Sequence, residues 1–217
     1  MTSATLDFYY EFASPYSYLS AMRIAAVAEA AGVRVHWKPF LLGPIFAAQG
    51  HADSPFNVFP IKGAHMWKDM DRLAARQGLP PVTRPDPFPG HSLLAARVAL
   101  FLDEGSRPSF SRALFQAQFA GGRDIGARET VRQVLAGLGH FCADIIAEAE
   151  SPANKERLRA RTEEAKARGV FGAPSFVTAD GELFWGNDRL EMAVDHASAL
   201  ARTPGDNSAR ARREGTG

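Results

Sequence analysis

The chain of 217 residues is poor in cysteine and has no excess of charge of either sign. Its single cysteine, Cys142, cannot form an internal disulfide, and one thiol excludes both a Cys-x-x-Cys redox pair and a cysteine-rich zinc site. The 25 Lys and Arg residues balance 24 Asp and Glu residues, so the sequence lacks the basic footprint of a protein that binds nucleic acid or an anionic membrane. We therefore expect neither a nucleic-acid partner nor a membrane partner.

Long apolar runs are also missing. No stretch approaches the roughly 20 residues that a helix needs to cross a bilayer, and residues 1–7 show neither the positive start nor the apolar segment of a secretory signal. With 46% hydrophobic and 23% charged residues, the composition is typical of a globular protein, which we expect to be cytoplasmic. Residues 203–217 contain no large apolar side chain, and they predict a disordered tail.

Several common catalytic motifs are absent. The six histidines show no His-x-x-x-His spacing, which argues against a metal site formed by residues close in sequence. The chain has no Gly-x-Ser-x-Gly elbow, no Walker loop and no Gly-x-Gly-x-x-Gly after a strand. Cys142 falls in a helical pattern beside Ile145 and Ile146, which predicts a small buried hydrophobic residue rather than a nucleophile.

The first 40 residues have the pattern of a β-α-β unit. The aromatic run from Leu6 to Phe12 predicts a buried strand, and Ser14 followed by Pro15 is typical of a helix N-cap and first helical turn. This helix is expected to end at Gly32, before an alternating strand over Val33–Trp37. The simplest arrangement is two parallel strands with a right-handed crossover.

The rest of the chain changes from helices to strands late in the sequence. From Gly63 to Arg168 every periodic segment is helical. Two short strands, Ser175–Thr178 and Glu182–Trp185, then flank an Asp-Gly turn and precede a last amphipathic helix from Leu190. The order predicts an α/β thioredoxin-like domain, formed by residues 1–42 and 168–202, with an all-helical insertion over residues 43–167 between its β-α-β and β-β-α halves.

Three segments carry candidate functional residues, and each also has a purely structural interpretation. Ser14 stands where a helix N-terminus favours an anion, but it also serves as an ordinary cap. Pro174 opens a strand; a cis bond there would turn the preceding backbone groups outward to pair with a peptide, and sequence alone does not show the isomer. Asn187 or Asp188 is placed to cap the last helix.

Taken together, these segments resemble the 2-hydroxychromene-2-carboxylate isomerase family, relatives of kappa-class glutathione transferases within the DsbA-like group. The opening signature F-x-x-x-F-x-S-P-Y-S-Y-L spans Phe8 to Leu19. Pro60-Ile61-Lys62-Gly63 matches a second signature ahead of the helical block. A third signature is present as Phe171-Gly172-Ala173-Pro174 together with Trp185-Gly186-Asn187-Asp188-Arg189.

The resemblance implies that glutathione supplies the thiol that the chain lacks at its helix start. Ser14 would hydrogen-bond the glutathione sulfur as a thiolate. Ala173, beside Pro174, would pair with the cysteinyl backbone. The γ-glutamyl ammonium would meet Asp188, with help from Asn187.

Lys62 would neutralise the glycyl carboxylate of glutathione. Asp53 or Ser54 falls where a kappa-class enzyme has an asparagine for this group, and Asn57 is an alternative. Four aromatic residues are candidates for the walls of a substrate pocket: Tyr16, Tyr18, Trp67 and Phe88.

By the same resemblance, the function is glutathione-dependent cis–trans isomerisation of 2-hydroxychromene-2-carboxylate or a related small aromatic substrate, in a homodimer. A thiolate would add reversibly to a conjugated alkene, so glutathione would act as a cofactor. Two alternatives remain open. One is a kappa-class-like transferase that conjugates an electrophile, and the other is a non-catalytic module that binds glutathione or a peptide.

Overall fold

The computed structural model describes residues 4–50, 54–140 and 142–202, so the predicted tail over 203–217 lies outside the described residues. The first half of the thioredoxin-like unit comprises β1 (Ala4–Tyr10), α1 (Pro15–Ala30) and β2 (Val33–Pro39). The second half comprises β3 (Ser175–Thr178), β4 (Leu183–Trp185), a 3-10 turn (Asn187–Arg189) and α10 (Leu190–Arg202).

Between β2 and β3 the described chain forms helices and no strand. These helices are α2 (Leu42–Ala48), α3 (Pro55–Val58), α4 (Pro60–Arg76), α5 (Leu93–Phe101), α6 (Ser106–Phe119), α7 (Arg128–Gly137), α8 (Cys142–Ala149) and α9 (Pro152–Ala167). Cys142 begins α8 as the periodicity predicts, while its side chain lies outside what the structure describes.

The four strands form one mixed sheet in the order β2-β1-β3-β4. β1 runs parallel to β2, whereas β3 is antiparallel to both β1 and β4. Phe8 lies opposite Trp37 on one side and Phe176 on the other, so aromatic residues run across the sheet. This topology, with the helices between its two halves, confirms the α/β thioredoxin fold with a helical insertion.

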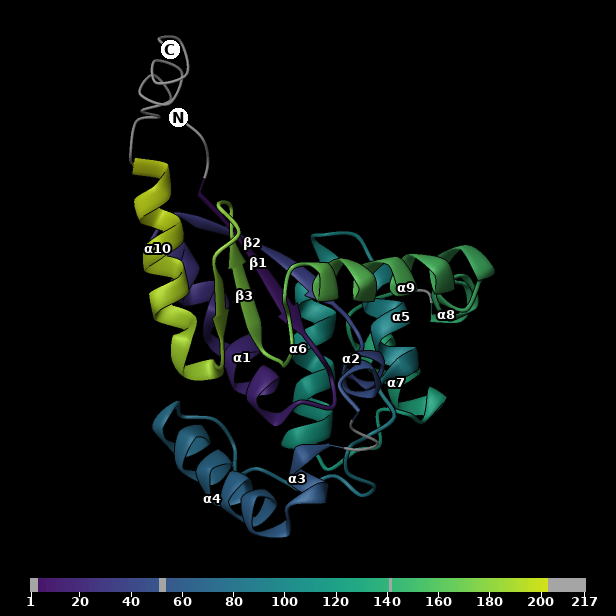
Figure 1. Ribbon diagram of the computed structural model, residues 1–217. Coiled ribbons are helices and arrows are strands. Elements are labelled where there is room, and N and C mark those ends of the chain that lie inside the picture. Colours follow the sequence, from purple (N-terminus) through teal and green to yellow (C-terminus); the bar gives the residue numbers. More distant parts are fainter. Residues whose placement is uncertain (1–3, 51–53, 141, 203–217) are drawn as a thin grey trace, which may run out of the picture.

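Alternation along β1 separates two cores. Leu6, Phe8 and Tyr10 lie in the larger core, toward the face on which α1 and α10 pack. Tyr9 points to the opposite face, where it joins a smaller cluster that includes Ala165 of α9. Figure 1 shows α1 and α10 on one side of the sheet and α9 on the other. The sheet is therefore buried on both faces, which suits its run of aromatic and aliphatic residues.

Local sequence explains how α1 begins and ends. The Ser14 hydroxyl accepts the backbone N–H of Ser17, and Pro15 occupies the first helical position, so the predicted N-cap is confirmed. After Ala31, Gly32 adopts a φ of 67°, which lets the chain turn directly into β2. The N-terminus of α1 is thus fixed at the carboxyl end of β1, and this end of the sheet carries the site described below.

The hairpin after the helical insertion is also as predicted, with Gly181 at a φ of 90° in its turn. The Ala173–Pro174 bond just before β3 is cis, which answers the question that the sequence left open. The Gly186 N–H donates to the Pro174 carbonyl at 3.0 Å, so the segments that flank the hairpin are joined beside the start of α1. In the described part of the chain, no helix is both long and apolar enough to span a membrane.

Candidate functional site

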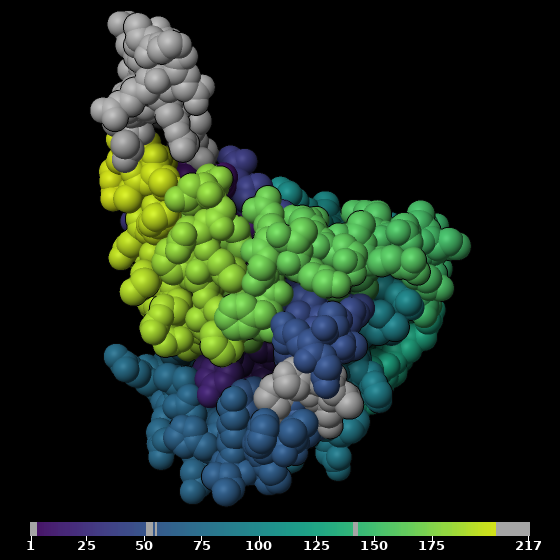
Figure 2. All heavy atoms as spheres, viewed as in Figure 1, coloured from purple at the N-terminus to yellow at the C-terminus, as the bar shows by residue number. Residues whose placement is uncertain are grey.

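An open cavity of about 1400 Å³ lies at the N-terminus of α1. Its lining comes from the start of α1, from α2 and α4, from the segment before α5, and from the segments on either side of the β3–β4 hairpin. Figure 2 shows a recess between the blue surface of α3 and α4 and the light green surface around the hairpin. All three signature segments of the sequence therefore meet at one place.

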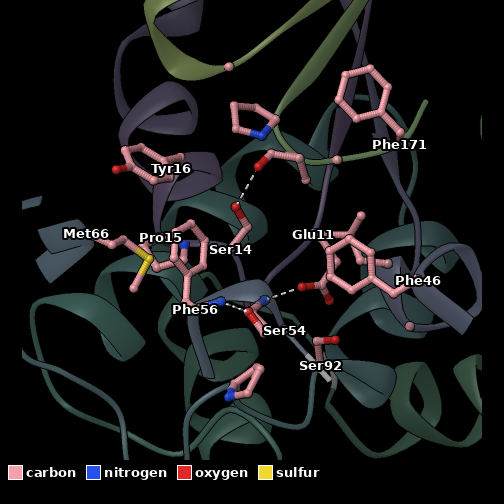
Figure 3. Close-up of a pocket in the computed structure, with 18 of the residues that line it drawn as sticks. Glu11, Ser14, Pro15, Tyr16, Phe46, Ser54, Phe56, Met66, Ser92 and Phe171 are labelled. Carbon is pink, nitrogen blue, oxygen red and sulfur yellow. Dashed lines mark hydrogen bonds between the residues drawn. The ribbon is translucent and has the colours of Figure 1, made fainter. Parts of the chain in front are cut away.

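Ser14 lies between the two sides of this cavity (Figure 3) and is 8% exposed. Its hydroxyl donates to the Ala173 carbonyl at 2.9 Å and accepts the Ser17 N–H at 3.2 Å. The first-turn N–H groups and the positive end of the α1 dipole add a preference for negative charge here. Ser14 is therefore both a cap and a hydrogen-bond donor at a position that favours an anion.

Ala173 and Pro174 are held next to Ser14 by packing as well as by this hydrogen bond. The Phe171 and Trp185 rings lie 4.9 Å apart, and a side chain at Gly172 would collide with the Trp185 indole. Among the described residues the Ala173 N–H has no hydrogen-bond acceptor, whereas its carbonyl accepts the Ser14 hydroxyl. Ala173 therefore presents its backbone N–H and carbonyl beside the cavity.

Asn187 and Asp188 both line the cavity, but their environments differ. Asn187 is 6% exposed, and its Oδ1 accepts hydrogen bonds from the Ser20 hydroxyl at 3.0 Å and from Arg23. Asp188 is exposed and pairs with Arg189 at 2.8 Å. The predicted side-chain cap of the last helix is wrong, because Gly186 leads into the 3-10 turn without such a cap and the Asn187 oxygen is held by α1.

Lys62 lies in the first turn of α4, is exposed, and lines the cavity with its ammonium 5.7 Å from the centre of the Phe56 ring. Of the residues considered for the glycyl carboxylate, Ser54 lines the cavity. Asn57 instead donates to the Phe88 carbonyl at 3.1 Å, and Asp53 lies outside the described residues. The structure therefore brings together all six predicted site residues: Ser14, Lys62, Ala173, Pro174, Asn187 and Asp188.

Two of the four predicted wall residues reach the cavity. Tyr16 and Phe88 line it, and the Tyr16 hydroxyl donates to Asp69 at 2.9 Å. Tyr18 is fully buried and stacks on Phe119. It points away from the cavity because it lies two positions after Tyr16, and positions two apart on a helix are about 200° apart around its axis. Trp67 packs edge-on against Phe88 but is not among the residues that line the cavity. The assignments of Tyr18 and Trp67 to the wall are therefore wrong.

Glu11 is a cavity residue to which the sequence analysis gave no role. It is 4% exposed; its Oε2 accepts the Ala13 N–H at 2.7 Å, and the Ser92 side chain also hydrogen-bonds to the carboxyl group. Burial outweighs both hydrogen bonds and raises the pKa of the Glu11 carboxyl to about 7. The available signal was an acidic residue inside an otherwise aromatic run over residues 8–12.

The two sides of the cavity differ in polarity. Toward α4 the lining includes Lys62 and Asp69. Burial of the phenol raises the pKa of Tyr16, and the hydrogen bond to Asp69 and the negative charges of Asp69 and Asp188 raise it further. Toward α2 the side chains are mainly apolar: Leu41, Leu42, Phe46, Leu93 and Phe171. In Figure 3, Tyr16 and Met66 lie on one side of Ser14, and Glu11, Phe46 and Phe171 on the other. No group of three or more His, Cys, Asp or Glu residues in the described chain is arranged to hold a metal.

Comparisons with known proteins agree with this architecture. The model of the DsbA-like thioredoxin domain matches residues 5–198. A 2-hydroxychromene-2-carboxylate isomerase from Sphingobium xenophagum is 32% identical over 191 residues, which cover 87% of this chain and 95% of that protein. Glutathione S-transferase kappa 2 from Caenorhabditis elegans is 26% identical, with 92% and 94% of the two chains covered.

A solved structure of a 2-hydroxychromene-2-carboxylate isomerase superposes with a TM-score of 0.82 at 26% identity, covering 91% of this chain and 96% of that one. The similarity thus extends over the sheet, the helical insertion and all three signature segments. The chain belongs to the DsbA-like thioredoxin family, and within it to the 2-hydroxychromene-2-carboxylate isomerase family.

Proposed function

We propose that the protein catalyses glutathione-dependent cis–trans isomerisation of 2-hydroxychromene-2-carboxylate or a related aromatic substrate. The observation that carries the proposal is the Ser14 hydroxyl at the N-terminus of α1, in a large cavity and in a chain whose single cysteine begins α8. A site that favours an anion, with a serine at the helix start, suits a thiol brought by a ligand. The names of the relatives support an isomerase and a link to glutathione.

The residues present fit glutathione by their chemistry. A tripeptide with an ammonium group and two carboxylates needs anionic and cationic partners, together with a backbone pair for its middle residue. Asp188, Lys62 and Ala173 offer these groups from three different segments around the cavity. The Ala173 N–H, which has no acceptor among the described residues, supports this assignment because a ligand carbonyl would satisfy it.

When bound, glutathione supplies a thiolate that adds to a conjugated carbon and leaves again. Ser14 favours that charge by turning its hydroxyl proton from the Ala173 carbonyl toward the sulfur, while its oxygen still accepts the Ser17 N–H. The Ala173 carbonyl is then available to accept an N–H from the ligand backbone. The α1 dipole acts in the same direction, so the thiol pKa falls and more of it ionises.

The apolar α2 side of the cavity suits the aromatic ring of the substrate. Leu41, Phe46 and Phe171 offer flat and aliphatic surface on this side of the cavity, and Ser14 itself is only 8% exposed. A drier site strengthens each hydrogen bond that Ser14 makes to a charged group.

A transferase that conjugates an electrophile is the second candidate, because a kappa-class transferase is among the relatives. The same Ser14 and Lys62 would serve it, and the difference is whether the carbon–sulfur bond breaks again. A module that only binds glutathione or a peptide is the third candidate.

The test combines binding and product analysis. Reduced glutathione should bind in calorimetry, and Lys62→Gln and Asp188→Asn should each weaken binding by about two- to fivefold, because an exposed charged contact contributes about 0.5–1 kcal/mol. With an aromatic cis-enone in excess, an isomerase yields the trans isomer and leaves free glutathione constant. One thioether per turnover would identify a transferase, and binding without turnover would identify a module. No binding of glutathione would refute the isomerase and the transferase and would leave only a module that binds a peptide.

A further inference from the structure

We propose that Glu11 is the acid that protonates the carbonyl oxygen of the aromatic substrate as the thiolate adds, and that it takes the proton back when the thiolate leaves. This inference rests on the proposed function. It concerns a buried carboxyl group that neither the glutathione contacts nor the fold requires to be ionisable.

The position of Glu11 supports this role. Glu11 follows β1 and lines the cavity near Ser14, on the same side as Phe46 and Phe171 (Figure 3). A ring held against these apolar side chains would place its conjugated chain between Ser14 and Glu11. The sulfur and the acid would then act on two ends of one conjugated system.

The state of the Glu11 carboxyl group supports it as well. At 4% exposure, and with a pKa raised by burial to about 7, the group changes protonation near neutral pH. The Glu11 carboxyl group accepts one hydrogen bond from the Ala13 N–H and one from the side chain of Ser92, the residue directly before α5. Both stabilise the carboxylate that remains after the proton has left, which is what a reversible acid needs.

The proposed step balances. As the carbon–sulfur bond forms at the β-carbon, the alkene π pair moves toward the carbonyl group, whose oxygen takes the proton of Glu11. The former double bond is now single and rotates. When the carbon–sulfur bond breaks, the electron pairs return, and the Glu11 carboxylate recovers its proton, so nothing is oxidised or consumed.

Other titratable groups around the cavity need to be separated from Glu11 in any pH profile. α2 and the segment 170–174 contribute none, since their sequences hold no ionisable side chain. The ionisable groups that line the same cavity from α1, α4, the segment before α5 and the segment after the hairpin are Tyr16, Lys62, His65, Asp69, His91, Asp188 and Arg189. His91 is the neighbour of Ser92 in sequence, so His91→Gln is the matched control.

The experiment measures turnover against pH for the wild-type protein, Glu11→Gln, Glu11→Asp, Ser92→Ala and His91→Gln, with saturating glutathione. The wild-type rate should fall as pH rises through about 7, where Glu11 loses its proton. Glu11→Gln should lose about 10²-fold in kcat and should also lose this decline. Glu11→Asp should retain a decline with pH. Ser92→Ala should move it to higher pH, because the hydrogen bond that stabilises the carboxylate is gone.

A second readout needs no glutathione. Difference infrared spectroscopy should show a carboxyl band that titrates near pH 7 in the wild type and is absent in Glu11→Gln. In Ser92→Ala the midpoint of this titration should move to higher pH. The affinity of the wild type for the saturated analogue 4-phenyl-2-oxobutanoate should fall as pH rises above about 7. The affinity of Glu11→Gln for this analogue should not change over the same pH range.

The outcomes separate this inference from the proposed function. Wild-type rate and pH profile in a folded Glu11→Gln variant would overturn the role of Glu11 while leaving glutathione dependence intact. If Glu11→Gln does not fold, the other variants test the role of Glu11. A fall of turnover at the same pH in Ser92→Ala as in the wild type would overturn this role, and so would the loss of that fall in His91→Gln. If the infrared titration and the analogue binding behave as expected but the protein shows no turnover with glutathione, the proposed function is refuted instead.

Discussion

Replacing Ser14 by alanine is the most informative perturbation, because one hydroxyl has two structural contacts and one proposed chemical role. The Ser14 oxygen accepts a hydrogen bond from the Ser17 N–H, and the Ser14 hydroxyl donates a hydrogen bond to the Ala173 carbonyl. Loss of an N-cap costs about 1 kcal/mol and loss of a neutral hydrogen bond about 1 kcal/mol more. We expect Ser14→Ala to lower the free energy of unfolding by about 2 kcal/mol.

The chemical effect should be larger than this loss of stability. A donor that is removed from a developing or resting anion costs about 2–4 kcal/mol, or roughly 10²–10³ in rate. If about 2 kcal/mol of this stabilises the resting thiolate, the pKa of bound glutathione rises by about 1.5 units. The assay is the ultraviolet thiolate absorbance of the bound ligand against pH, at saturating glutathione.

The chain offers a matched control for the cap. Ser151 caps α9 in the same way as Ser14 caps α1, with its hydroxyl accepting the Asn154 N–H at 3.3 Å before a proline. It is not among the residues that line the cavity. Ser151→Ala should therefore destabilise the fold by about 1 kcal/mol and leave the thiolate titration unchanged. Identical titrations for wild type and a folded Ser14→Ala variant would show that Ser14 is only a cap.

Three further predictions concern other residues. Cys142→Ala should leave glutathione-dependent turnover unchanged, since the proposed thiol comes from the ligand; a folded but inactive variant would point to a nucleophile in the chain. Glu11 has a folded pKa of about 7 against an ordinary value of 4.5, so its contribution to stability is complete below pH 4.5 and is lost as pH rises to about 7. Unfolding free energies should fall by about 3 kcal/mol over this range in the wild type, and Glu11→Gln should remove that slope. Gly172→Ala should displace the Trp185 indole and cost about 1–3 kcal/mol, with weaker glutathione binding; an unchanged melting temperature and affinity would contradict the packing argument.

Most of the fold followed from local patterns, and the failures have local causes too. The strands and long helices carried clear alternation or caps, such as Ser14-Pro15 and Ser151-Pro152. The short helix α2 was not predicted individually, since its N-cap residue, Leu41, offers no side-chain cap and the helix contains Gly43 and Pro44. Tertiary packing supports it instead, because Ile45 is buried in the cluster with Phe40 and Val170.

The site residues divide in the same way. The predicted contacts were residues within the signature segments, and the cavity brings those segments together. Whether Tyr16 or Tyr18 faced the cavity depended on the rotation of α1 relative to the rest of the fold, which no local pattern gives. Glu11 needed still more, because its partner Ser92 lies 81 positions away (92 minus 11) and only the fold shows their contact.

The distribution of burial around the cavity matches a division between binding and chemistry. Lys62 and Asp188 are exposed, so contacts to them gain little from a low dielectric and stay similar throughout a reaction. Interactions of this kind hold a ligand without lowering the barrier of the chemical step. Ser14 and Glu11 are 8% and 4% exposed, and both lie where charge would appear and disappear. Groups fixed in such a dry position interact more strongly with changing charge, and this is where a rate advantage arises. Variants of the exposed pair should therefore act on affinity, and variants of the buried pair on turnover, because the same cavity provides two different dielectric environments.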